Sequence, residues 1–168
     1  MGSTAQILSP RKTTLTLEER VADFLEIIRP LGFYTKVEKY DQAVYMAPVI
    51  DSEHAVHVWV DQEDYPIYTI NGVDYYREVF YDWIWDDERH GPESMNSDMI
   101  LAITAEYMKK YPDALFQFEW SGDDNMFLDK TDIDNTVLQP FDPSWFGEVR
   151  SHLRSARVDK YGDEWTLG

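Results

Sequence analysis

The sequence predicts an α+β protein, in which an antiparallel sheet of four to six strands carries helices packed mainly on one face. Short runs rich in aromatic and β-branched residues, typical of strands, follow one another between residues 33 and 70. Apolar residues at helical spacing precede these runs, and a second helical pattern begins near residue 96. The turn signal Asn71-Gly72 indicates that the strands form an antiparallel meander.

The length and composition indicate a single domain. The chain has 168 residues, of which 43% are hydrophobic and 15% aromatic, which argues against disorder throughout. We expect a flexible tail over residues 1–13, one globular domain over residues 14–158 and a frayed end over residues 159–168. The apolar runs are too short to cross a bilayer, the first residues lack a secretory pattern, and cysteine is absent. These features predict a cytoplasmic protein without disulfide bonds or thiol chemistry.

The negative charge is concentrated in the middle of the chain. The formal net charge is −17, and residues 41–134 contain 22 acidic and 5 basic side chains, whereas the two flanks together hold ten of each sign. Such a field repels phosphate, which argues against direct binding of nucleic acid or of anionic membranes. It favours a basic protein partner attracted by electrostatic steering. Acidity that only keeps a protein in solution would give the same composition.

The local signals are clearest between residues 14 and 70. Thr16 and Glu19 have the spacing of a capping box, and the apolar stripe that follows predicts a helix ended by Pro30 and Gly32. Four strands are expected after this helix, within the segments FYTKVEKY, AVYMAPVI, HAVHVWV and PIYTI.

The segment 73–85, VDYYREVFYDWIW, fits two structures. A helix capped by Asp74 would place Val73, Tyr76 and Phe80 on one face, whereas the alternation of a strand fits almost as well. We predict a helix, because a turn and a capping residue precede a long run.

Four further elements are expected after residue 91. A helix capped by Asn96 or Ser97 ends at Pro112, and ALFQFEW then alternates like a strand. Thr131 is expected to cap a short helix over DIDNTVL, and a last helix is expected over about residues 143–155.

No arrangement of residues identifies a reaction. His54 and His57 lie three positions apart on a predicted strand, so their side chains would face opposite ways and could not bind one metal ion. DKTDID at 129–134 lacks the glycine and the closing glutamate of a calcium loop, and no nucleophile elbow or phosphate-binding glycine loop is present. We predict no metal, no cofactor and no enzymatic activity. The alternative is a carboxylate-based enzyme, with or without a metal ion.

Tryptophans beside carboxylates predict a docking surface. In YDWIWDDERHGPESMNSD, residues 81–98, large rings lie beside six acidic side chains. Tyrosine and tryptophan are frequent interface anchors, and carboxylates around them pair with basic side chains of a partner. The alternative is an amphipathic element whose rings point inward. The predicted partner-binding residues are Trp83, Trp85, Asp86, Asp87, Glu88, Asp123 and Asp124.

The segment MILAITAEYMKKYPDALFQFEW, with the acidic turn and DKTDIDNTV after it, resembles small acidic α+β immunity proteins of bacterial polymorphic toxin systems. The resemblance covers about residues 96–135 and is carried by aromatic, turn and capping residues: Tyr107, Tyr111, Pro112, Asp113, Phe116, Phe118, Trp120, Thr131, Asp132 and Ile133. It implies a cytoplasmic, non-enzymatic inhibitor that covers the active site or the substrate face of a cognate toxin. Many such toxins are basic nucleases or deaminases, which would suit the acidic charge.

The predicted function is therefore that of an acidic inhibitor that binds a basic cognate toxin domain. A protein that mimics nucleic acid and blocks a DNA- or RNA-binding protein is one alternative, and an adaptor subunit without inhibitory activity is another. The sequence predicts neither the identity of the partner nor the oligomeric state.

Overall fold

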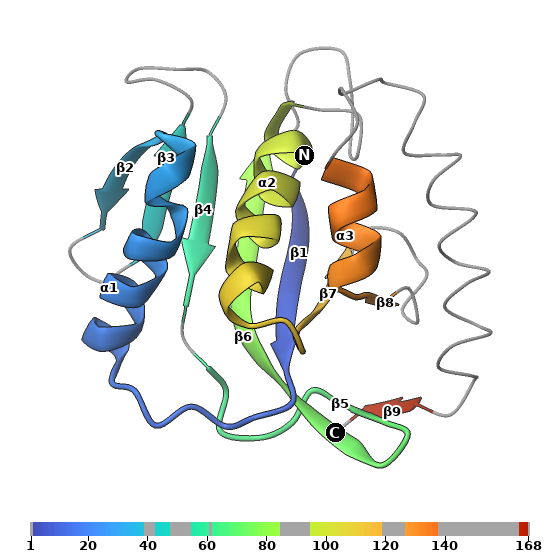
Figure 1. Ribbon diagram of the computed structural model, residues 1–168. Helices are drawn as coiled ribbons and strands as arrows, with labels where there is room; N and C mark the ends of the chain where they lie inside the picture. The colour runs from blue at the N-terminus through green and yellow to red at the C-terminus, as the bar shows by residue number, and fades with distance from the viewer. Residues whose placement is uncertain are drawn as a thin grey trace.

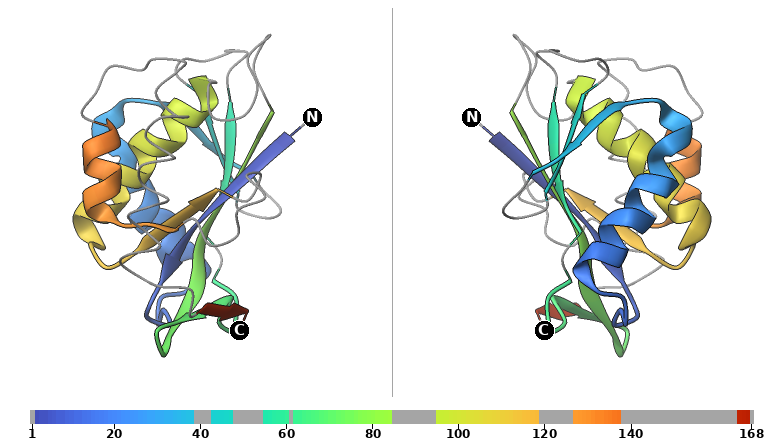
Figure 2. Two further views of the ribbon diagram at one scale, coloured as in Figure 1. Left: turned by 90° about the vertical axis from the view of Figure 1, so that its right-hand side faces the viewer. Right: turned by 90° about the vertical axis from the view of Figure 1, so that its left-hand side faces the viewer.

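The computed structural model describes seven segments of the chain: residues 2–38, 43–47, 55–60, 62–84, 95–118, 127–137 and 165–167. All strand pairs in these segments are antiparallel, and all three α-helices lie on one face of the sheet (Figures 1 and 2). The predicted α+β class is confirmed, but nine strands are described where four to six were expected. No helix in these segments is long and apolar enough to cross a membrane.

The strands run in the order β2-β3-β4-β6-β1-β7-β8, with β5 pairing with β6, and β9 with β5. The strands are β1 (Gly2–Ser9), β2 (Tyr34–Val37), β3 (Val44–Ala47), β4 (Val56–Trp59), β5 (Tyr68–Ile70), β6 (Val73–Ile84), β7 (Leu115–Phe118), β8 (Phe127–Leu128) and β9 (Trp165–Leu167). The helices are α1 (Leu17–Ile28), the short 3-10 turn η1 (Arg29–Leu31), α2 (Met95–Lys110) and α3 (Lys130–Val137). The predicted helix near residues 143–155 lies outside the described segments.

The first strand, β1, is central in the sheet, so the prediction of a flexible tail over residues 1–13 is wrong. β1 pairs with β6 on one side and with β7 on the other. Ala5, Ile7 and Leu8 are fully buried, and so is Gln6 between them. The sequence pattern does not predict this strand, because it contains a buried glutamine and few large apolar residues. Its partner strands are also distant in sequence. The expected frayed end is also wrong for residues 165–167, because β9 pairs with β5.

Residues 73–84 form the strand β6, so the predicted helix over 73–85 is wrong. β6 begins at a tight turn in which Asn71 and Gly72 have positive φ values of 50° and 80°, as the turn signal predicts. It then pairs with β1 on one edge and with β4 on the other. Pairing on both edges satisfies its backbone and decides between two structures that the local pattern fits almost equally well.

A β-bulge interrupts β6 at Glu78. Ile7 pairs with Val79 and Leu8 pairs with Arg77, so the pairing with β1 passes over Glu78. An extra residue on one strand reverses the alternation of its side chains. The bulge therefore places Glu78, rather than Arg77, on the same side of the sheet as Val79.

The start of α1 agrees with the prediction, but those of the other two helices differ from it. Glu19 N–H donates to Thr16 Oγ1 and Thr16 N–H donates to Glu19 Oε1, both at 3.2 Å, which confirms the capping box. α2 begins at Met95, so the predicted capping residues Asn96 and Ser97 lie within it.

Asp129, rather than Thr131, caps α3. Asp132 N–H donates to the Asp129 carboxylate at 3.1 Å, and Asp129 N–H donates to the Asp132 carboxylate at 3.0 Å. This reciprocal pair is a capping box made by two aspartates. Thr131 lies inside the helix.

The main core lies between the sheet and the helices. Phe24 of α1, Ile103 of α2 and Ile133 of α3 are buried against the sheet, where Tyr81 and Phe116 are also fully buried. A second, smaller cluster of buried residues joins β5 to the ends of other strands and contains Leu8, Tyr68, Ile70, Leu115 and Phe127. The helices therefore cover one face of the sheet, and we call it the helix face.

Candidate functional site

Most of the predicted partner-binding residues lie outside the described segments. They are Trp85, Asp86, Asp87, Glu88, Asp123 and Asp124. Trp83 lies near the end of β6, where its backbone pairs with Val56 and Ser3, but its side chain is outside the description. Docking through these residues stays a prediction. The described residues offer two further candidates: a cavity under the helices and a row of rings on the other face of the sheet.

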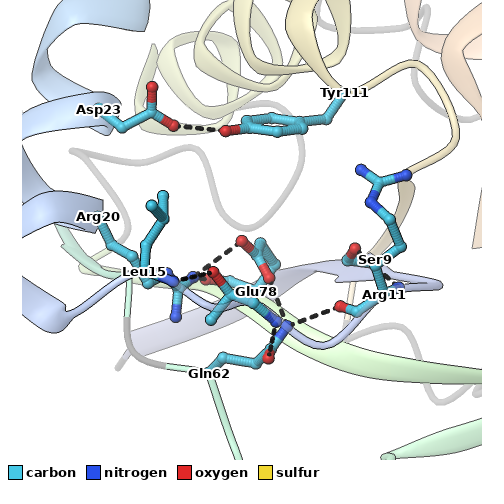
Figure 3. A network of polar contacts seen from close by, with 9 residues as sticks. Ser9, Arg11, Leu15, Arg20, Asp23, Gln62, Glu78 and Tyr111 are labelled. Carbon is cyan, nitrogen blue, oxygen red and sulfur yellow. Dashed lines mark hydrogen bonds and ion pairs between the residues drawn. The ribbon is translucent and has the colours of Figure 1, made fainter.

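The cavity has a volume of about 290 Å³ and lies where α1 and the end of α2 meet β1 and β6. An ion pair between Arg20 of α1 and Glu78 of β6 forms one wall of it (Figure 3). Arg20 Nη2 lies 3.1 Å from Glu78 Oε1 and donates to the backbone oxygen of Glu78 at 2.5 Å. The two side chains are only 6% and 13% exposed, so neither charge has ready access to water.

Gln62 connects this ion pair to the segment after β1. Its Nε2 donates to Glu78 Oε2 at 2.7 Å and to the backbone oxygen of Arg11 at 3.0 Å. Its Oε1 accepts from the backbone N–H of Thr13 at 2.7 Å. One amide side chain therefore holds β6 and the connection between β1 and α1 together.

Tyr107 of α2 and Tyr111, the residue after α2, also line the cavity. Tyr111 donates to Asp23 of α1 at 2.6 Å (Figure 3). Lys110 forms an ion pair with the same carboxylate. Burial, then the hydrogen bond to Asp23, raises the pKa of Tyr111 to about 12. Burial, then the nearby charge of Glu78, also raises the pKa of Tyr107. Both phenols therefore keep their protons at neutral pH.

The polar groups of the cavity are thus engaged with one another. The carboxylates of Glu78 and Asp23 each have at least two donors, and the phenols are protonated. Such mutual satisfaction is typical of a structural network that fastens helices to a sheet.

The second candidate is a row of aromatic rings that crosses three strands. Tyr45 of β3, His57 and Trp59 of β4, and Phe80 of β6 follow one another with ring centroids 5.6, 5.9 and 5.9 Å apart. We call the surface that these four side chains form the ring face. His57 is exposed and the other three are half-buried.

The register shows that the ring face is opposite the helices. Val44, Val58 and Tyr81 are paired across β3, β4 and β6, and all three are fully buried in the core on the helix face. Each of them is a strand neighbour of a member of the ring face. Successive side chains of a strand point to opposite sides, so the rings lie on the side away from α1, α2 and α3.

Charged side chains border the rings. Asp82 of β6 is opposite His57 in the register. Arg77 lies over Phe80, with its guanidinium carbon 5.1 Å from the ring centroid, and forms an ion pair with Glu63. The ring face therefore combines aromatic area with carboxylates, the combination that the sequence predicts for residues 81–98.

The basic side chains of the described segments are almost all paired internally. These segments contain nine lysines and arginines, of which eight form ion pairs with Asp or Glu: Arg11, Lys12, Arg20, Arg29, Arg77, Lys109, Lys110 and Lys130. Over the whole chain, acidic side chains outnumber basic ones by 17. The excess of carboxylates therefore acts on molecules outside the chain.

Pattern reading missed the ring face, although its signal is in the sequence. Tyr45, His57 and Trp59 alternate with buried valines or methionine within two predicted strands. Only the pairing of the strands places these rings beside one another. His54 and residues 86–90 lie outside the described segments. Within those segments, no group of three or more His, Asp or Glu side chains is placed to hold a metal ion.

The comparisons with known proteins give no match. No family model, no curated protein and no solved structure is similar to this chain at the threshold used for a match. The resemblance to immunity proteins therefore depends on the residues quoted for it.

Proposed function

We propose that this protein is a cytoplasmic inhibitor that binds and neutralises a basic protein, as an immunity protein does with its cognate toxin. A nuclease or deaminase domain is the kind of toxin we expect. The observation that carries the proposal is the ring face, a row of four rings on rigid strands in a chain of net charge −17.

Two physical arguments support the ring face as a contact surface. Aromatic side chains bury a large area at little cost in conformational entropy, and those on paired strands are already ordered before a partner binds. The acidic field of the chain would speed the approach of a basic partner, whereas Asp82 and Glu63 would select for basic groups near the rings. β6 ends at Ile84, so the predicted residues Trp85 to Glu88 follow this surface directly in the chain.

The test compares the wild-type protein with a variant that lacks two of the rings. Tyr45→Ser combined with His57→Ser removes two rings, and Tyr65→Ser is the control because Tyr65 is 58% exposed and outside the row. Each protein is used to capture proteins from the lysate of the source organism over a salt series. We expect one basic protein to be held by the wild-type and control proteins and lost by the ring variant.

The captured protein is then purified and tested for inhibition. Its expression should be toxic, and the wild-type protein should relieve the toxicity while the ring variant does so weakly. Equal capture by the ring variant would remove the ring face from the proposal. Release of many basic proteins together at low salt would reduce the interaction to charge alone and contradict the proposal.

A further inference from the structure

A second cavity, on the ring face, is lined by two rings and two charged groups. It has a volume of about 320 Å³ and is bounded by Trp59, Phe80, Glu63 and Arg77. The ring centroids of Trp59 and Phe80 are 5.9 Å apart and their planes are inclined by 50°. Aromatic rings beside a carboxylate are the groups that hold a guanidinium, through cation–π attraction and paired hydrogen bonds.

Arg77 of the same chain supplies a guanidinium to this cavity. Its guanidinium carbon lies 5.1 Å from the centroid of Phe80, and its Nη2 pairs with Glu63 Oε1. The bulge at Glu78 makes this possible, because in a regular strand Arg77 would lie on the same side as the buried Val79. The wall of the cavity thus shows how a guanidinium is held by Phe80 and Glu63, and a basic partner would present the same chemical group.

The hydrogen bonding of Arg77 is incomplete. Its Nε is buried and has no hydrogen-bond partner among the described residues, which is unfavourable for a charged donor. The side chains of Arg77 and Glu63 are 28% and 33% exposed, so both can be reached from solvent. Arg77 therefore lines the cavity with one donor unsatisfied among the described residues, and its side chain is partly accessible to solvent.

We propose that this cavity receives an arginine side chain of the basic partner, and that the incoming guanidinium takes the place of Arg77 at Glu63. The inference rests on the proposed function, because it names the group through which the basic partner is recognised. Arginine fits better than lysine, since a planar guanidinium stacks on a ring and forms two parallel hydrogen bonds with a carboxylate. The released Arg77 regains contact with water, and Glu63 keeps a cationic partner throughout.

The experiment is a titration with acetyl-arginine methylamide, which needs no identified partner. Binding is followed by nitrogen-15 NMR at the indole N–H of Trp59 and the Nε–H of Arg77. The same compound made from lysine, acetylated at Nα so that its side-chain ammonium is kept, tests the preference for a guanidinium. The citrulline analogue, which is uncharged, tests the need for charge. We expect the arginine compound to bind most tightly, with the Arg77 signal moving towards that of a solvated side chain.

Two pairs of variants isolate the cavity from the charge of the chain. Arg77→Gln removes the resident guanidinium, and Arg29→Gln makes the same change of charge at an ion pair with Glu26 that is 71% and 67% exposed. We expect Arg77→Gln to bind the arginine compound about threefold more tightly than Arg29→Gln does. This ratio corresponds to the free energy of a partly exposed ion pair, which the compound no longer has to break. Glu63→Gln should weaken binding relative to Glu26→Gln.

Equal affinities of Arg77→Gln and Arg29→Gln, or equal binding of the arginine and citrulline compounds, would overturn the inference. If Arg77→Gln does not fold, the comparison of Glu63→Gln with Glu26→Gln decides in the same way. Failure of this inference is separable from failure of the proposed function. A ring-dependent partner without any effect of Arg77→Gln would overturn the cavity assignment alone, whereas arginine binding without such a partner would support the cavity and contradict the inhibitor.

Discussion

The two faces of the sheet are built from the same strands but differ in what they contact. On the helix face, Val58 and Tyr81 are fully buried beneath the helices. On the ring face, their neighbours His57 and Phe80 belong to a row of rings that none of the described helices covers. The comparison indicates a division of roles within single strands. One set of alternating side chains stabilises the fold, and the other forms the surface that we propose as the contact for a partner.

At the bulge in β6, two adjacent charged residues contact different faces of the sheet. Glu78 joins the network under the helices, through Arg20 and Gln62, while its neighbour Arg77 joins the ring face. A regular strand would also place neighbours on opposite faces, but it would put Arg77 on the same side as Val79. The extra residue exchanges the two positions. Glu78 can therefore pair with Arg20 on the helix face, and Arg77 can pair with Glu63 on the ring face.

The largest expected effect comes from the helix face. Phe116→Ala should lower the free energy of unfolding by about 3–5 kcal/mol, because it leaves a cavity in the core. Tyr45→Ser on the ring face should lower it by less than about 1.5 kcal/mol, since it removes one half-buried ring contact. Urea unfolding of the three proteins measures both values. Similar losses for the two variants would contradict the division of roles.

The buried ion pair should come next. Arg20→Met leaves the Glu78 carboxylate buried without its cationic partner, and we expect a loss of about 3 kcal/mol in the free energy of unfolding. The control is Arg29→Met, which breaks a surface ion pair and should cost less than about 1 kcal/mol. Thermal and urea unfolding provide the comparison. A cost for Arg20→Met no greater than that of the control would show that the network contributes little to the helix face.

The smallest expected effect is a change in the alkaline stability profile. The native pKa of Tyr111 is about 12, above the value of about 10 that an unfolded tyrosine has. The native state therefore holds this proton longer, so the stability that Tyr111 contributes is fully present below about pH 10 and is lost as the pH rises towards about 12. Tyr111→Phe should flatten this part of the profile.

Melting temperatures of the wild-type protein and Tyr111→Phe, measured from pH 8 to pH 11, test this expectation. The wild-type protein should be the more stable at pH 8, because the variant lacks the hydrogen bond to Asp23. The difference should narrow above about pH 10. A difference that stays constant over this range would mean that the proton of Tyr111 is not linked to folding.

Part of the fold could be predicted because its signals are local. The capping box at Thr16, the Asn71-Gly72 turn and the four strands between residues 33 and 70 each depend on residues close together in the chain, and the structure confirms them. The capping residue of α3 was misplaced by two positions, because Thr131 and Asp129 are both good capping residues. Which of them caps depends on where the preceding strand, β8, ends.

The central strands could not be predicted, because their signals are not local. β1 contains a buried glutamine, and Gln6 is stabilised in the sheet by a hydrogen bond to Gln117 at 2.7 Å, across a separation of 111 residues. β6 fits a helix and a strand almost equally until its two partner strands are known. The ring face and its arginine cavity depend on the same pairings and on the bulge, so they were missed as well.

The sequence by itself determined the α+β class, the acidic character and the positions of the elements whose caps and turns are encoded in neighbouring residues. Charge and local propensity add up along the chain and need no partner to be known. The tertiary structure alone decided that the first segment is a central strand, that β6 is extended, and which side chains share a face. These features depend on pairing between distant segments, where a shift of one residue moves every side chain of a strand to the other face.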